Sequence, residues 1–312
     1  MMIDFKKIKR IYKSIDIYDI YNDCKVSTFD TTPPLDVIDI IEKCVFCWNS
    51  SREFVKKCNK IITIEISQYK FKFYYQNNLY IPMYRIYATI KNVLLVQKIF
   101  NINKPLQFHI FLNEDKREIS LNSRDIITSK NINGGFTNVL DNDIFIVRME
   151  EFSKTIIHEM LHHSIIDNSF SQQDTDILKS IFNISQNMHL KCNEAIIEFY
   201  TTIIYIMILS CETNIEWRKL LDIEINHSIK QANKILEKQK NSGGIWYEET
   251  NCYCYIVFKA ILLLNYDKFM KITNIPYSSE TITKFLIEHK EIPKIERNKI
   301  SDNSLRMMIF SN

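Results

Sequence analysis

The chain has 312 residues, of which 46% are hydrophobic and 25% are charged, and its formal net charge at pH 7 is +3. These values are ordinary for a soluble globular protein and exclude the apolar-poor composition of a disordered chain. The basic residues are spread along the sequence, so the weak positive charge does not indicate a nucleic-acid partner.

Neither end of the sequence shows a membrane or export signal. The N-terminus lacks the apolar core of a signal peptide, and no uninterrupted apolar run reaches the roughly 18–20 residues that span a bilayer. The nearest candidate, residues 195–211, is interrupted by Glu198. Eight cysteines without a secretory signal are typical of reduced thiols. We therefore expect an intracellular protein with no membrane partner, and we interpret Cys44 and Cys47 as packed core thiols.

The first third of the chain has helical and strand patterns in succession. Residues 1–58 are predicted to form a mostly helical N-terminal segment. Residues 60–77 alternate between apolar and polar side chains, which predicts a hairpin. Residues 83–100 have a helical period, and residues 106–112 are predicted to form a strand. His109 lies in that strand, and we interpret it as a sheet residue rather than a metal ligand.

The rest of the chain changes from strands to helices. Gly134–Gly135 predicts a turn before two short strands at 136–139 and 144–148, and an apolar helix follows. The last third, residues 213–312, has mainly helical patterns. These patterns predict an α+β fold, with a small twisted sheet followed by a helical C-terminal half.

One helix carries the pattern His158-Glu159-Met160-Leu161-His162. At helical spacing, His158 and His162 lie on one face, where two imidazoles can bind one metal ion. Glu159 is placed to take a proton from a metal-bound water. Apolar residues cover most of the remaining circumference, including Ile165, so the helix is predicted to be buried. Burying these polar groups would be costly without a metal ion to partner them.

A second apolar helix supplies candidates for the third ligand. Glu194 and Glu198 are one turn apart inside a strongly apolar segment. Two carboxylates in such a helix are explained if Glu194 binds the metal and Glu198 accepts the free N–H of a ligand imidazole. The alternative third ligand is His189. If residues 189–194 were helical, His189 and Glu194 would point about 140° apart, so only one of them could bind.

The motif at 158–162, followed by Asn193-Glu194-Ala195-Ile196-Ile197-Glu198, resembles the gluzincin metallopeptidases, the thermolysin-like group. Position 198 departs from that family, which has Asp there. A wider resemblance to zincin-type proteins of large DNA viruses adds Gly134–Thr137, Arg148–Glu151 and Ser304–Met307. A viral chain would act in the host cytoplasm or the virion.

The gluzincin resemblance implies a Zn²⁺ cofactor, a protein or peptide substrate, and peptide hydrolysis by Glu159-assisted attack of a zinc-bound water. The sequence patterns and this resemblance together predict three regions. The first is the helical segment 1–58, the second is a zincin catalytic core at 59–212, and the third is a helical subdomain at 213–312.

Residues outside the motifs are assigned to substrate and to the developing oxyanion. An edge strand within 136–147, including Phe136, is expected to bind extended substrate, as in zincins generally. Tyr255 is our choice for the oxyanion donor; His227, Tyr247, Tyr253 and His289 remain alternatives. Arg148 is either a substrate anchor or an ion-pair partner of Glu151.

A non-catalytic interpretation also remains open. In it, a zincin-like structural, interaction or virion protein holds a purely structural zinc. Such a site usually closes with four protein ligands, and it would leave Glu159 without a role.

Overall fold

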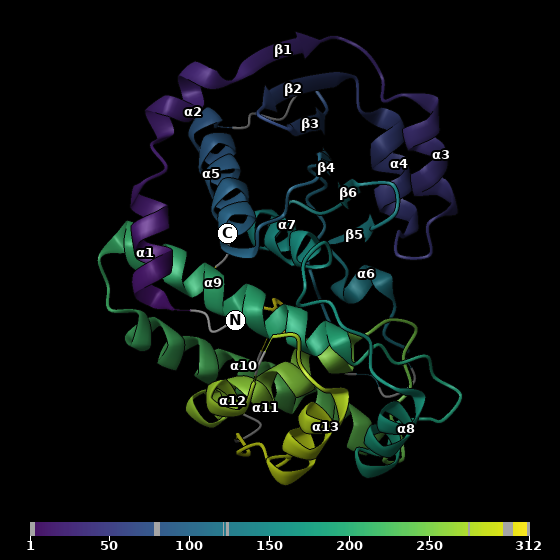
Figure 1. Cartoon of the computed structure of the whole chain (residues 1–312). Helices are drawn as coiled ribbons and strands as arrows, with labels where there is room; N and C mark the ends of the chain where they lie inside the picture. Colours follow the sequence, from purple (N-terminus) through teal and green to yellow (C-terminus); the bar gives the residue numbers. More distant parts are fainter. Residues whose placement is uncertain are drawn as a thin grey trace. The chain divides into compact units, whose positions relative to one another are not determined.

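The computed structural model describes residues 4–77, 82–120, 122, 125–273, 275–295 and 302–310. These residues divide into two compact units. The predicted region boundaries at 58 and 212 stay a prediction. The sheet unit comprises Asp4–Lys116 and Asn133–Ser164, and the helical unit comprises Arg117–Ile132 and Ile165–Phe310. The fold is α+β, as predicted, with a mixed sheet in the N-terminal half and a mainly helical C-terminal half (Figure 1).

The sheet of the described residues has six strands in the order β1-β2-β3-β4-β6-β5. β2 and β3 form the predicted antiparallel hairpin, whose turn contains Ser67 at φ 52°. β3, β4 and β6 are parallel neighbours, while β1 and β5 pair antiparallel with the strands beside them. The strand bounds are β1 Lys25–Phe29, β2 Lys60–Ile66, β3 Tyr69–Tyr75, β4 Leu106–Phe111, β5 Gly135–Asn138 and β6 Asp143–Ile146.

One face of the sheet, the inner face, is apolar along every central strand. Strand alternation and the pairing register place these residues on it: Ile62, Ile64, Ile66, Phe71, Phe73, Phe108, Ile110, Ile144 and Ile146. Helix α7 (Phe152–Leu161) packs on β5 and β6, and α5 (Met83–Phe100) packs against α7. A Cβ added at Gly135 would lie 2.7 Å from the carbonyl oxygen of Phe145 and 3.1 Å from Thr155 of α7. Glycine at this position therefore allows α7 to approach the sheet closely.

The opposite, outer face is covered at one end only. Helices α3 (Leu35–Lys43) and α4 (Asn49–Lys57) contribute to a buried cluster there, with sheet residues that include Ile61, Tyr74 and Phe111. One row further along β2 and β3, the outer-face side chains Thr63 and Lys72 are polar and partly exposed. The apolar cluster of the outer face thus ends at this row of the first strands.

The N-terminal segment contains a strand that the sequence prediction missed. Helices α1 (Phe5–Lys13) and α2 (Ile17–Asp23) follow the predicted helical pattern and pack on α5. Residues Lys25–Phe29 then form β1, whose five residues are all exposed. Because no side chain of β1 is buried, its sequence carries no strong alternation. Met1–Ile3 lie outside the described residues.

The helical unit is built around α9 (Asn193–Thr213), which contacts α10, η1 and α11. By length and composition α9 could cross a membrane, and 83% of its most apolar window is buried within the structure. That burial is what a core helix of a folded protein requires. The other helices of this unit are α6 Ser129–Ile132, α8 Gln172–Ile181, α10 Trp217–Asn241, the π-helix η1 Cys254–Phe258, α11 Lys259–Leu264, α12 Tyr266–Ile272 and α13 Ser279–Glu288.

Candidate metal centre

Helix α7 carries the two histidines of the motif on one face. The ring centroids of His158 and His162 are 5.2 Å apart. The prediction that this helix is buried is confirmed, because every residue of α7 except Ser153 is buried, and His158 and Glu159 are each only 5% exposed. The helix follows Glu151, which has the left-handed φ of 62°.

The end of α7 differs from the prediction. The helix ends at Leu161, and His162 is its C-cap residue, still in the right-handed helical conformation. The His158–His162 spacing is therefore helical even though the helix stops there. Ile165, which the sequence pattern included in the buried helix, lies beyond the end and is 54% exposed. The Nε2 of His163 lies 2.6 Å from the hydroxyl of Thr137 on β5.

The second motif opens helix α9. The Asn193 side chain donates to the Asp167 carboxylate at 2.7 Å, which ties the start of α9 to the loop between α7 and α8. Glu194 is 6% exposed and Glu198 is fully buried. Residues 189–192 precede the helix, so the assumption of a helix through 189–194 was wrong, and the exposed His189 lies in a loop.

His158, His162 and Glu194 form a group that could hold a metal ion. Each offers one ligand atom, and these atoms all lie within 4.8 Å of one another. His158 and Glu194 are buried and His162 is half-buried. Two imidazoles and one carboxylate are a donor set that suits a divalent transition metal and leaves room for a further ligand. The residues present therefore fit a metal ion of this class.

Glu198 belongs to a buried charged cluster of the helical unit. The ammonium of Lys259 lies 3.9 Å from Glu198 and 3.8 Å from Glu224, and all three side chains are at most 1% exposed. Lys259 also donates to the carbonyl oxygen of Met307, and Glu224 accepts from the backbone N–H of Ile309 at 3.0 Å. The predicted role of Glu198 as acceptor for a ligand imidazole stays a prediction.

Sequence reasoning missed Lys259 and Glu224. A signal for Lys259 was present, because it is the only charged residue in the apolar run from Tyr255 to Leu264. A lysine inside such a run needs a buried carboxylate partner. Glu224 had no comparable signal, since its helix, α10, has charged residues throughout.

The remaining predicted residues occupy different surroundings. Tyr255 is half-buried in η1, which packs against α9. Phe136 lies on β5 and stacks on Phe145 with ring centroids 4.8 Å apart. Arg148 is fully buried; its Nε donates to the carbonyl oxygen of Asn133 at 2.9 Å, and its guanidinium lies 4.4 Å from the ring centroid of Trp48. Their substrate and oxyanion roles stay predictions.

Two of the alternatives for the oxyanion donor, His227 and Tyr253, have partners of their own. The ring of His227 lies 3.0 Å from the carbonyl oxygen of Arg306, and the hydroxyl of Tyr253 donates to Gln239 at 3.2 Å. Tyr253 is 1% exposed, which makes it a core residue of the helical unit.

No family model, no curated protein and no solved structure matches this chain.

Proposed function

We propose that this protein is a zinc-dependent endopeptidase of the gluzincin type. The observation that supports the proposal best is the group His158, His162 and Glu194, with Glu159 next to the first histidine on a buried helix. Zinc is the metal that two histidines and a glutamate hold in hydrolytic sites of this kind. When bound, it would act as a Lewis acid toward the substrate carbonyl and the attacking water.

Glu159 has the central role among the protein residues. Its carboxylate takes a proton from the attacking water and then delivers that proton to the leaving amine. Burial supports this role, because bulk water has little access to the carboxylate and does not compete with the bound groups for its proton. Glu198 is proposed to orient a ligand imidazole, and Tyr255 to donate to the developing oxyanion.

Strand β5 is the proposed substrate-binding element. It is the last strand of the sheet, so one backbone edge is not paired with another strand of that sheet. An extended peptide can add to such an edge through main-chain hydrogen bonds. The proposed substrates are therefore unfolded or loop segments of proteins, with Phe136 and Arg148 contributing to their binding.

The first test is the zinc content of the purified protein by plasma mass spectrometry. Wild type is expected to hold about one zinc per chain, and Glu194→Ala is expected to lose it. Glu212→Ala is the matched control, because Glu212 lies on the same helix α9 and is exposed. His189→Ala should keep its zinc. Zinc retained in Glu194→Ala but lost in His189→Ala would contradict the assigned ligand set.

The second test is hydrolysis. The zinc-loaded protein should cleave fluorescently labelled casein, a chelator should abolish the cleavage, and added Zn²⁺ should restore it. A zinc-loaded protein that cleaves neither casein nor a mixed peptide library would instead support a structural zinc.

A further inference from the structure

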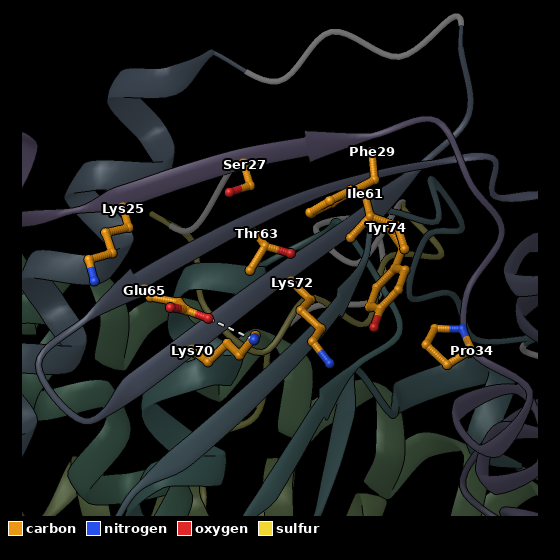
Figure 2. Close-up of a pocket in the computed structure, with 10 residues that line it drawn as sticks. All are labelled: Lys25, Ser27, Phe29, Pro34, Ile61, Thr63, Glu65, Lys70, Lys72 and Tyr74. Atoms are coloured by element: carbon orange, nitrogen blue, oxygen red, sulfur yellow. Dashed lines mark ion pairs between the residues drawn. The ribbon is translucent and has the colours of Figure 1, made fainter.

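The outer face of the sheet has a pocket in the sheet unit, where the cover of α3 and α4 ends. Its volume is about 360 Å³, within the range of small-molecule sites. Figure 2 shows the pocket lying over the first three strands. Its lining residues are Lys25, Ser27, Phe29, Pro34, Ile61, Thr63, Glu65, Lys70, Lys72 and Tyr74.

The register of the three strands arranges this lining in rows. Lys25, Glu65 and Lys70 are cross-strand neighbours and form a charged row. Ser27, Thr63 and Lys72 form the next row, and Phe29, Ile61 and Tyr74 form the third. Because residues two apart on a strand share a face, the three rows form one surface that changes from charged to hydroxyl-bearing to apolar.

Lys72 is the cation at the centre of this surface. In Figure 2 its side chain extends into the open space between Lys70 and Tyr74. Lys70 is already paired with Glu65 at 2.7 Å. Lys72, in contrast, has no hydrogen-bond or ion-pair partner in the described part of the chain. Desolvation by burial, followed by the charge of Lys70, lowers the pKa of Lys72, although the charges of Asp143, Asp36 and Glu65 oppose this shift. An anion bound beside it would relieve both effects.

Hydrogen bonds to neighbouring residues fix the ring of Tyr74 at the apolar end of the pocket. The hydroxyl of Tyr74 lies 3.0 Å from Nδ1 of His109, and the amide of Gln107 lies 2.8 Å from Nε2 of the same ring. That amide also donates to Asp143 at 3.1 Å. Burial lowers the pKa of His109 and so favours its neutral ring. The tyrosine ring is therefore a fixed wall of the pocket.

We propose that this pocket binds a small organic phosphate monoester. The phosphate is held by Lys72, with Lys25 and the hydroxyls of Ser27 and Thr63 around it, and the organic group lies against Phe29 and Ile61. Two features suit a phosphate. The cations are lysines, which act as point charges toward phosphate, and the hydroxyls of Ser27 and Thr63 can donate to its further oxygen atoms. The site is separate from the proposed metal centre and does not depend on it.

The probe for this proposal is phenyl phosphate, titrated into the full-length protein by isothermal calorimetry. Lys72→Gln is expected to weaken binding about tenfold or more, because a charge-assisted contact is lost. Lys72→Arg keeps the charge and should retain most of the affinity. Thr63→Val, which removes only a hydroxyl, should weaken binding about threefold. Lys98→Gln is the matched control, because Lys98 is an exposed lysine on α5 and its loss changes the net charge equally.

Two further ligands test the two halves of the pocket. Inorganic phosphate should bind more weakly than phenyl phosphate, since it makes no apolar contact, and benzyl alcohol should bind more weakly still. Equal binding of inorganic and phenyl phosphate would overturn the role of the apolar end. Phenyl phosphate binding that is unchanged in Lys72→Gln, or equally weakened in Lys98→Gln, would overturn the site itself. The same holds if no saturable binding of phenyl phosphate is detected.

Discussion

Lys259 in the helical unit and Lys72 in the sheet unit both lie beside apolar residues, yet their charges are neutralised differently. Lys259 is 1% exposed and has two buried carboxylates and a backbone carbonyl as permanent partners. Lys72 is half-buried in the lining of a pocket and has no hydrogen-bond or ion-pair partner in the described ranges of the chain. A fully buried charge must be compensated by the fold itself, whereas a charge at a pocket can be compensated by a ligand.

The largest expected effect concerns a third buried charge, Glu159. The change Glu159→Gln should lower casein hydrolysis about 10²- to 10⁴-fold, because the amide cannot accept the proton of the attacking water. Zinc content and melting temperature should stay at wild-type values. Glu53→Gln, at an exposed glutamate of α4, is the control and should keep full activity. Hydrolysis retained by Glu159→Gln would sink its assignment as the base.

Removal of the buried cation gives the next effect. Lys259→Met should lower the free energy of unfolding by about 3–5 kcal/mol, because it leaves the buried Glu198 and Glu224 without their shared cation. Lys72→Met, measured in parallel by urea unfolding, should change it by less than about 1 kcal/mol. Equal losses in the two variants would mean that the buried carboxylate partners of Lys259 do not make its removal more costly to the free energy of unfolding than the removal of Lys72.

Much of the fold could be predicted from periodicity alone. The hairpin at β2–β3, helix α5 and the buried helix α7 all have strong apolar patterns, and the structure confirms each of them. Strand β1 could not be predicted, because its exposed residues have no burial pattern and its position is set by pairing with β2. Pairing partners far apart in sequence leave no local signal.

The candidate metal centre was predictable to the extent that its motifs are local. His158 and His162, with Glu159 between them, are four residues apart, a little over one helical turn, and so are Glu194 and Glu198. The Lys259 cluster and the Lys72 pocket are different, because each combines residues from several elements. Their chemistry depends on register and packing, which a single sequence does not specify.

A buried carboxylate that has no ion pair with any residue of the described ranges extends the comparison to pH. Glu248 is 2% exposed and accepts backbone N–H bonds from Cys252 and Tyr253 at 2.7 and 2.9 Å. Desolvation by burial outweighs these bonds and raises the pKa of Glu248 from its ordinary value of 4.5 to about 7. Between these values the folded state binds more protons than the unfolded state, so the free energy of unfolding falls as pH rises.

Glu248→Gln tests this directly, because the amide cannot titrate. Between pH 4.5 and 7 the wild type should lose up to about 3 kcal/mol of stability from this group, a loss that should be missing in the variant. The measurement is urea unfolding of both proteins at pH 5 and pH 7. Identical pH dependence in the two proteins would show that Glu248 is already ionised in the folded state at pH 5.

The smallest expected effect has the opposite sign and concerns the pocket. Glu65 is exposed and pairs with Lys70 at 2.7 Å, so it competes with a bound anion for that lysine. The change Glu65→Gln should therefore tighten phenyl phosphate binding, by about two- to threefold, because exposed ion pairs are weak.

Asp39→Asn is the matched control, since Asp39 is exposed and pairs with Lys43 at 3.5 Å on α3. Calorimetric titration of both variants separates a local effect from one of net charge. A gain in Glu65→Gln alone would mean that Lys70, once released from Glu65, joins Lys72 in holding the phosphate. Equal gains in the two variants would instead be an effect of net charge and would contradict a role for Lys70.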